Sequence, residues 1–314
     1  MLDSASKAFF HLIARSRTLK TIASRYGMRR PSSFARRFIA GETVAEAIET
    51  ARAVEARGMT VTMDLLGESV TSLDKADAAT RDYIAVIDAM VASGVGRNVS
   101  LKLTQLGLDV DKAMAIDNFR KILGRAEPAG FFVRIDMENS PYTEVTLEIF
   151  ETLWRHGHRQ IGVVLQSALY RSENDLARLN ALGGRVRLTK GAYKEPKAAA
   201  YQKKTDVDAA FARMVKTLIT AGHYPAIATH DPAMIELTRA IAREHDVAPD
   251  RFEFQMLNGV RRDLQTMLVK AGYRVRVYIP FGREWFPYFM RRLGERPANV
   301  MFMLRGIFGE RGSS

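Results

Sequence analysis

The chain contains no cysteine among its 314 residues. This absence excludes a disulfide framework, a cysteine-based zinc site and a thiolate nucleophile, and it fits a reducing cytoplasm. The sequence also lacks any stretch of the ~20 consecutive apolar residues that a membrane-spanning helix needs. No segment has the composition of a low-complexity region or an interdomain linker. Because 47% of the residues are apolar, we expect one large core.

Acidic residues are scarce at the start of the chain. Between Met1 and Gly41 there are nine Lys or Arg against one acid, Asp3, in a protein with a formal charge of +12. Such a segment could contact an anionic membrane, RNA or an acidic partner, or it could form solvated basic helices beside the main body. Its composition is that of a transit peptide, but the helical spacing of Phe9, Phe10 and Ile13 favours packing onto the body.

After Gly41, short apolar runs rich in Val, Ile and Leu alternate with longer amphipathic segments. Each run has the length and composition of a buried strand. The predicted strands are Met59–Leu65, Asn98–Leu103, Phe131–Met137, Ile161–Gln166, Val186–Lys190, Pro225–His230, Phe252–Leu257 and Arg274–Pro280.

The segments between these runs carry signals for the starts and ends of helices. The predicted starts are Asp74, Asp111, Ser172 and Asp231-Pro232, and the predicted ends are Gly94, Gly157, Gly183, Gly222 and Gly272.

Eight strands that alternate with helices predict an α/β protein, a (β/α)8 TIM-type barrel. The competing fold is an open doubly wound sheet, which usually has a glycine-rich turn after its first strand. Here that position reads Leu66-Gly67-Glu68-Ser69, so we favour the barrel. We expect residues 1–40 to form a basic helical segment, residues 41–310 to form the barrel domain, and the last helix to lie over the barrel mouth.

Polar side chains gather at the carboxyl ends of the predicted strands, where barrel enzymes keep their active sites. These ends include Lys102, Asp136, Gln166, Arg187, Lys190, Thr229, His230 and Tyr278. A purely structural role stays open for each of them. Lys102 and Asp136 could be a buried ion pair, and His230 could cap the helix that begins at Asp231. Arg291 and Arg292 could clamp a carboxylate or lie solvated on the surface.

In four blocks the sequence resembles the proline dehydrogenase family, flavoenzymes that begin the degradation of proline. The resemblance runs from about Phe38 to Phe308, and the short chain is similar to the monofunctional bacterial members. The blocks are Arg187–Pro196, Ala228–Asp231, Phe252–Leu257 and Tyr288–Pro297.

The resemblance implies FAD bound across the barrel mouth, and no metal. Met137 and Gln166 would contact the flavin, and Arg187 would lie beside its reactive edge, where a cation favours the anionic reduced form. The residues implied to hold the rest of the cofactor are Lys190, Gly191 and Ala192 at the phosphates and ribose, with Thr229 and His230 at the adenylate.

For the substrate, L-proline, the resemblance implies a carboxylate clamp made by Lys102, Arg291 and Arg292, with Asp136 orienting Lys102. The pyrrolidine ring of proline would lie against Tyr193, Leu257, Tyr278 and Tyr288. Glu68 would pair with an arginine of the last helix and close the site. Hydride would pass from C5 to flavin N5 and give Δ1-pyrroline-5-carboxylate, and no residue stands out as the base for the ring nitrogen.

The family context further implies a membrane quinone as electron acceptor, Δ1-pyrroline-5-carboxylate dehydrogenase as a functional partner, and the bacterial cytoplasm, with peripheral membrane contact through the basic segment. Tyr288 would crowd a 4-hydroxylated ring, so hydroxyproline should be a poor substrate. Asn258 and Thr189 depart from the family pattern without removing a charge.

Two other functions remain open. An aldolase-like barrel could form a Schiff base at Lys102 or Lys190. A nucleic-acid binder could use the basic N-terminal segment, but the chain has no recognised binding module, and we expect no nucleic acid partner.

Overall fold

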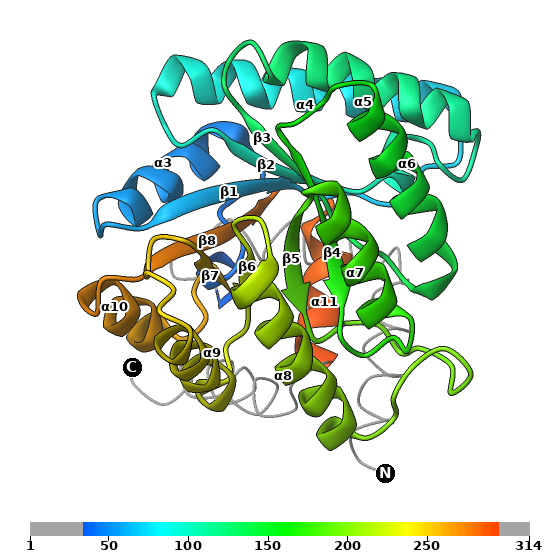
Figure 1. Ribbon diagram of the computed structural model, residues 1–314. Helices are drawn as coiled ribbons and strands as arrows, with labels where there is room; N and C mark the ends of the chain where they lie inside the picture. The colour runs from blue at the N-terminus through cyan, green and yellow to red at the C-terminus, as the bar shows by residue number, and fades with distance from the viewer. Residues whose placement is uncertain (1–33, 295–314) are drawn as a thin grey trace, which may run out of the picture.

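The computed structural model describes residues 34–294, with side chains to Met290. Eight parallel strands form a closed barrel in chain order, in which β8 pairs with β1 from Thr60–Arg276 to Leu65–Phe281. Figure 1 shows the helices arranged around this sheet. The (β/α)8 prediction is confirmed. The strands are β1 Thr60–Leu65, β2 Asn98–Leu101, β3 Phe132–Ile135, β4 Ile161–Gln166, β5 Arg185–Thr189, β6 Ala226–Ala228, β7 Glu253–Leu257 and β8 Arg274–Phe281.

Between residues 34 and 294, eight α-helices alternate with these strands around the barrel, and a ninth, α11, follows β8. They are α3 Val44–Glu55, α4 Leu73–Ser93, α5 Lys112–Ala126, α6 Thr143–Arg155, α7 Ser172–Leu182, α8 Lys204–Ala221, α9 Pro232–Glu244, α10 Arg262–Lys270 and α11 Trp285–Gly294. Three short 3-10 helices complete the described chain: η1 Phe34–Arg37, η2 Thr104–Leu106 and η3 Ser140–Tyr142.

Several helix boundaries follow the predicted signals. Asp111 accepts a hydrogen bond from the Met114 amide at 2.7 Å, and Asp231 caps α9 with Pro232 as its first residue. Gly94 and Gly183 end their helices in the left-handed conformation.

Two of the predicted start signals lie in the first turn of their helices without capping them. α4 is capped by Ser72, and Asp74 lies in the first turn. Ser172 begins α7 but does not cap it, because its hydroxyl donates to the Gln166 carbonyl at 2.6 Å.

The barrel has an apolar outside and a polar inside. Alternate strand residues such as Val61, Met63 and Val99 face the helices and belong to the continuous hydrophobic core. The intervening residues point inward and contact strands across the barrel: Arg187 of β5 donates to Ser100 of β2. TIM barrels usually fill this interior with branched apolar side chains. A charged interior therefore needs a separate explanation.

A second, smaller hydrophobic cluster closes the barrel mouth. Trp285, Phe286 and Phe289 of α11 pack with Ile39 and Leu66, which follow η1 and β1. Trp285 is also fixed by a 2.8 Å hydrogen bond from its indole nitrogen to Glu42. The prediction that the last helix lies over the mouth is confirmed.

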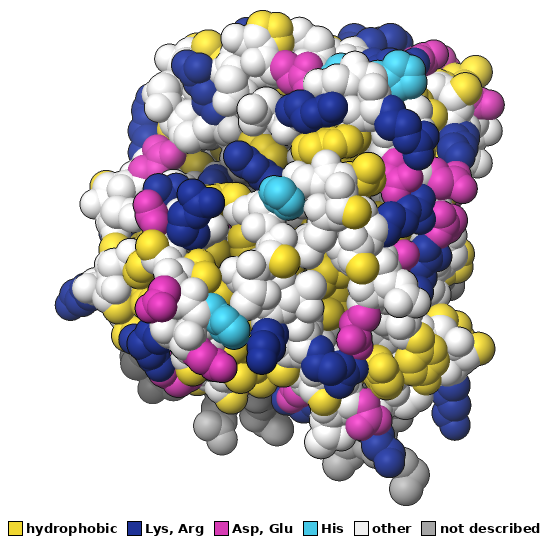
Figure 2. Space-filling model, in the orientation of Figure 1, with side chains coloured by type: hydrophobic (Ala, Val, Ile, Leu, Met, Phe, Trp, Pro, Cys, Tyr) yellow, Lys and Arg dark blue, Asp and Glu magenta, His cyan; other side chains and the backbone are white. Residues whose placement is uncertain are grey.

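Most of the basic N-terminal segment lies outside the described residues. Of its described part, Arg36 pairs with Glu46 at 2.5 Å and Arg37 donates to the Gly259 carbonyl at 3.3 Å. On the face of the barrel in Figure 2, basic and acidic side chains are interspersed. Several of the described surface charges form ion pairs, such as Arg213 with Glu173 at 2.6 Å. Between residues 34 and 294 no helix is long and apolar enough to cross a membrane.

Candidate active site

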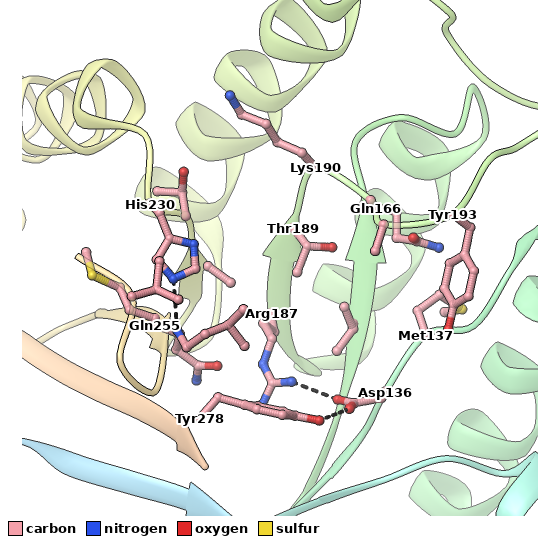
Figure 3. A pocket seen from close by; sticks show the side chains of 18 of the residues that line it. Asp136, Met137, Gln166, Arg187, Thr189, Lys190, Tyr193, His230, Gln255 and Tyr278 are labelled. Carbon is pink, nitrogen blue, oxygen red and sulfur yellow. Dashed lines mark hydrogen bonds and ion pairs between the residues drawn. The ribbon is translucent and has the colours of Figure 1, made fainter. Parts of the chain in front are cut away.

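A cavity of about 470 Å³ opens at the carboxyl ends of the strands (Figure 3), and Tyr288 and Phe289 of α11 also line it. This volume is typical of small-molecule sites. Most of the predicted site residues line it together: Lys102, Asp136, Met137, Gln166, Arg187, Lys190, Gly191, Ala192, Tyr193, Thr229, His230, Leu257, Tyr278 and Tyr288.

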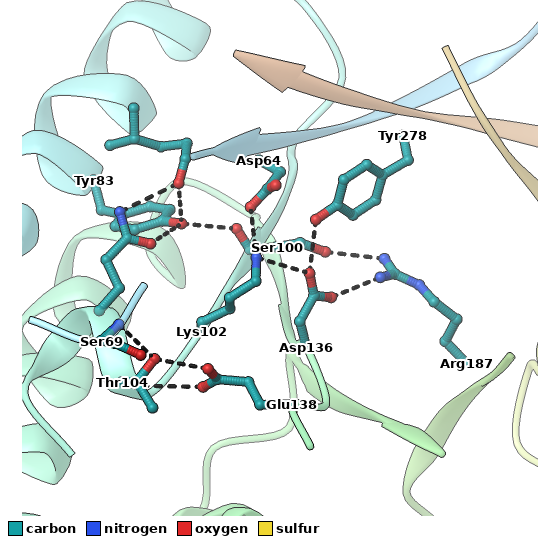
Figure 4. Close-up of polar contacts among 12 residues, drawn as sticks. Asp64, Ser69, Tyr83, Ser100, Lys102, Thr104, Asp136, Glu138, Arg187 and Tyr278 are labelled. Atoms are coloured by element: carbon teal, nitrogen blue, oxygen red, sulfur yellow. Dashed lines mark hydrogen bonds and ion pairs between the residues drawn. The ribbon is translucent and has the colours of Figure 1, made fainter. Parts of the chain in front are cut away.

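Asp136 is the centre of a polar network that borders the cavity (Figure 4). It follows β3 directly, and its Oδ1 accepts a 2.7 Å hydrogen bond from Arg187 Nη1. Its Oδ2 accepts a second, also 2.7 Å, from the Tyr278 hydroxyl. Burial, together with the charges of Asp136 and Asp64, raises the pKa of Tyr278, so the phenol keeps its proton and remains a donor.

Lys102 lies between two carboxylates. Its Nζ is 3.9 Å from Asp136 Oδ2 and 3.8 Å from Asp64 Oδ1. Burial lowers the pKa of this lysine, but the two carboxylates outweigh burial and raise it above its ordinary value. The predicted Lys102–Asp136 pair is therefore present, and Lys102 also lines the cavity, so its structural and binding roles are compatible.

Asp64 is a site residue that the sequence reading missed. It lies in β1, is fully buried, and is next to Ser100 of β2 and Pro280 of β8 in the barrel register. The available signal was a single carboxylate in the run Met59–Leu65, near the end where barrel sites form. We call Asp64, Lys102, Asp136, Arg187 and Tyr278 the mouth cluster.

The predicted cofactor residues surround the upper part of the cavity. The Gln166 amide donates to the Glu138 carbonyl at 2.9 Å. Lys190 is held between Asp208 at 2.5 Å and Asp231 at 2.7 Å. His230 accepts the Leu257 amide through Nε2 at 2.9 Å, so the α9 cap belongs to Asp231 and not to His230.

Two features distinguish the cofactor residues that the sequence predicts. Gly191 has φ +113°, and a Cβ there would lie 3.2 Å from Ala168 Cβ and 3.3 Å from Gln166 Oε1. A side chain at this turn, which lines the cavity, would therefore be both strained and crowded by the protein. Arg187 is 5% exposed, and its buried Nε has no hydrogen-bond partner among the described residues. A buried donor of this kind suits a ligand acceptor.

Tyr193, Tyr278, Tyr288 and Leu257 lie on the walls of the cavity, and their contact with the substrate ring stays a prediction. Glu68 lines a second cavity, of about 1120 Å³, which shares Lys102, Tyr193 and Tyr288 with the first. The side chains of Arg291 and Arg292 lie outside the described residues, although both residues belong to α11. The predicted pairing of Glu68 with an arginine of this helix stays a prediction.

A second polar cluster lies nearer the amino ends of the strands. Arg276 donates to both oxygens of Glu253, at 2.8 and 3.1 Å, and to the Val61 carbonyl at 2.7 Å. Gln255 also donates to Glu253. Although burial opposes it, the charge of Arg276 lowers the pKa of Glu253. We call Glu253, Gln255 and Arg276 the floor cluster.

The fold and the cavity are those of a barrel enzyme with its candidate site at the carboxyl ends of the strands. The family model for proline dehydrogenase matches residues 47–305. The chain is 41% identical over 302 residues to "Proline dehydrogenase 2" of Bacillus subtilis, covering 96% of this chain and 98% of that protein. It is 42% identical over 279 residues to the proline dehydrogenase of Deinococcus radiodurans, covering 88% and 90%.

Among solved structures, the barrel resembles proline utilization A from Bdellovibrio bacteriovorus inactivated by N-propargylglycine. The TM-score is 0.78 at 24% identity, over 98% of this chain and 40% of the other. The chain belongs to the proline dehydrogenase family and is an oxidoreductase that acts on proline. A flavin is the cofactor that this membership implies.

Proposed function

We propose that this chain oxidises L-proline to Δ1-pyrroline-5-carboxylate with FAD held in the cavity, and that the mouth cluster receives the substrate. The observation that carries the proposal is the position of Lys102 and Arg187. Both side chains are buried, and both line the cavity. Each is also paired with the carboxylate of Asp136.

Lys102 binds the proline carboxylate. The raised pKa of Lys102 keeps its ammonium group charged. The ammonium lies 3.8 and 3.9 Å from its two carboxylate partners, which leaves room for a shorter contact with a third carboxylate, that of the substrate. A charge-assisted hydrogen bond of about 2.8 Å to a substrate carboxylate would be the stronger interaction. Asp136 orients the lysine, and Arg291 and Arg292 of α11 complete the clamp.

The ring of proline lies against Tyr193, Leu257, Tyr278 and Tyr288, which line the cavity beside Lys102. Apolar walls suit the ring methylenes, and Tyr278, fixed by Asp136, keeps one face rigid. Tyr288 lines the cavity, and its hydroxyl beside the substrate ring would leave little space for a substituent at C4. Hydroxyproline is therefore a poor substrate.

Met137, Gln166 and Arg187 hold the flavin ring, which supplies a hydride acceptor for C5 of proline when FAD is bound. Arg187 presents a positive charge, fixed by Asp136 and Ser100, to the cavity. A fixed cation in a water-poor site stabilises negative charge as it develops. Lys190, Gly191, Ala192, Thr229 and His230 hold the phosphates and the adenylate.

The electrons pass to a membrane quinone, and the product passes to Δ1-pyrroline-5-carboxylate dehydrogenase. The chain is 28% identical over 312 residues to the "Bifunctional protein PutA" of Escherichia coli, of which it covers 24%. The basic N-terminal residues support contact with the inner face of the bacterial membrane.

An absorbance spectrum with and without proline tests this proposal. The purified protein carries a flavin spectrum that bleaches under anaerobic conditions with L-proline and far more slowly with 4-hydroxyproline. A protein that stays colourless after incubation with FAD would overturn it.

The aldolase alternative has less support. A Schiff-base lysine must be neutral to attack a carbonyl, whereas two carboxylates raise the pKa of Lys102, and Lys190 is held between two more. Borohydride with a carbonyl substrate should therefore trap no adduct.

A further inference from the structure

Asp64 and Asp136 lie on either side of Lys102 but differ in their hydrogen bonding. Asp136 accepts from Arg187 and from Tyr278 at 2.7 Å each. Asp64 is 0% exposed, and neither of its oxygens has a hydrogen-bond partner among the described residues. The Tyr278 hydroxyl also faces Asp64 but makes its hydrogen bond to Asp136. Buried carboxylates without partners are rare and need an explanation.

The groups that face Asp64 come from five elements. Lys102 follows β2, at 3.8 Å, and Asp136 follows β3 on the far side of that lysine. Tyr278 of β8, Arg187 of β5 and Tyr83 of α4 are close enough for mutual electrostatic effects. Burial raises the pKa of the Asp64 carboxyl and Asp136 adds to this effect, against the opposing charges of Lys102 and Arg187.

Substrate binding changes the charge balance of this cluster. With its acids and bases ionised, the mouth cluster has two negative and two positive charges and is neutral. Proline in solution is a zwitterion, but its ring nitrogen must lose a proton before the lone pair can assist departure of the hydride at C5. The bound substrate places its carboxylate next to Lys102, and the competition of this carboxylate for the lysine favours protonation of Asp64, which has the weaker contacts.

We propose that Asp64 takes up a proton as proline binds, so that the ring nitrogen becomes neutral with no net release of protons. The inference rests on the proposed binding of the proline carboxylate at Lys102. An N–H bond of the substrate ammonium breaks, its electron pair stays on nitrogen, and an O–H bond forms on Asp64. Lys102, which lines the cavity and reaches Asp64, passes a proton inward and regains one from the substrate side.

Calorimetry with cyclopentanecarboxylate isolates the proton uptake. This ring carboxylate carries the negative charge of the substrate but no ammonium, so any proton must come from the buffer. Titrating the FAD-loaded protein in buffers of different ionisation enthalpy gives the number of protons taken up. We expect uptake approaching one proton per ligand for the wild type and none for Asp64→Asn. Equal uptake by the two proteins, or none by the wild type, would overturn the proposal.

Glu138→Gln is the matched control. Glu138 is also a buried carboxylate near Lys102, 5% exposed, but its Oε2 accepts a 2.7 Å hydrogen bond from the Thr104 hydroxyl. The control should take up as many protons as the wild type, and a loss of uptake equal to that of Asp64→Asn contradicts the assignment to Asp64. Lys102→Met separates the two proposals, because unchanged ligand affinity in that variant would instead refute binding at Lys102.

The pH profile of kcat/KM gives a second measurement. In the wild type, kcat/KM for proline should reach a plateau above the pKa of Asp64, since the proton from proline then stays in the site. Without Asp64 the proton is lost to solvent, so kcat/KM should rise about tenfold per pH unit until the ammonium of proline itself ionises. If kcat/KM of Asp64→Asn reaches a plateau at the same pH as that of the wild type, the proposal is contradicted.

Should Asp64→Asn fail to bind flavin or to fold, the wild type alone still decides. Its proton uptake with cyclopentanecarboxylate should fall towards zero as the pH is lowered, because Asp64 is then protonated before the ligand arrives. Uptake that stays constant with falling pH overturns the proposal.

Discussion

Glu253 and Asp64 are both buried carboxylates inside the same barrel, 3% and 0% exposed, yet their surroundings differ completely. In the floor cluster both oxygens of Glu253 are held by Arg276. In the mouth cluster Asp64 has no hydrogen-bond donor among the residues that the structure describes, and Lys102 is 3.8 Å away. A paired and hydrogen-bonded carboxylate holds a structure together, whereas an incompletely paired one is typical of a functional site. The difference separates the part of the charged interior that maintains the barrel from the part that serves the reaction.

Lys102→Met should have the largest effect, because it removes the proposed partner of the substrate carboxylate. Truncating one member of a buried charge pair costs about 4 kcal/mol, so kcat/KM for proline should fall roughly 1000-fold. Steady-state kinetics on protein that retains its flavin spectrum measures this effect. Lys112→Met is the control, since Lys112 pairs with Glu148 at 2.5 Å on the surface and should change kcat/KM very little. Equal losses in the two variants would contradict the proposed role of the mouth cluster.

Arg276→Met should act on stability and not on turnover. It leaves Glu253 buried without its cation, which should lower the free energy of unfolding by about 3 kcal/mol. Arg276 lowers the pKa of Glu253, so the pair contributes stability above the ordinary pKa of a glutamate and loses it as the pH falls through the lowered value. The difference in the free energy of unfolding between wild type and variant, measured by chemical unfolding, should therefore become smaller at acid pH. A variant that is stable but inactive would show that the floor cluster has a catalytic role.

The fold could be predicted almost completely from the sequence. The run Ile161–Gln166 coincides with β4, and the Asp111 and Asp231 caps lie where they were expected. Such features depend on local periodicity and local hydrogen bonding, which neighbouring residues determine. Lys102–Leu103 were expected in a strand but lead into η2, because β2 pairs with β3 only as far as Leu101.

The site was harder to predict, because it depends on how distant strands meet. Asp64 is a single acid in an apolar run, and only the closure of the barrel puts it beside Lys102 and Asp136. The floor pair Glu253–Arg276 was missed for the same reason, since it joins β7 and β8. Residues of the cofactor site were named through the family resemblance, and the structure brings them to one cavity.

Gly191→Ala should have an intermediate effect, on flavin affinity. A positive φ and a crowded Cβ together strain an alanine by about 2 kcal/mol, and a turn that relaxes this strain when FAD is absent must restore it on binding, which weakens FAD binding roughly thirtyfold. Titration of the flavin-free protein with FAD measures this change. Gly94→Ala is the matched control, because Gly94 also has positive φ, +73°, but ends α4 with nothing within 4 Å of its Cβ position. That variant should lose stability while keeping its affinity for FAD.

Asp64→Asn should have the smallest effect on stability, and in the direction opposite to Arg276→Met. Because the pKa of Asp64 is raised in the folded protein, the folded state binds more protons than the unfolded state, and stability falls as the pH rises through this interval. An asparagine avoids burying the charge, so the variant should be more stable at neutral pH by about 1 kcal/mol. Its advantage should shrink as the pH is lowered to the ordinary aspartate value, where the wild-type carboxyl is itself protonated. Chemical unfolding at neutral and acid pH tests both statements. A less stable variant would mean that Asp64, like Glu253, stabilises the barrel. A more stable variant whose kcat/KM no longer reaches its plateau would show that the barrel retains an unfavourable charge because the reaction requires it.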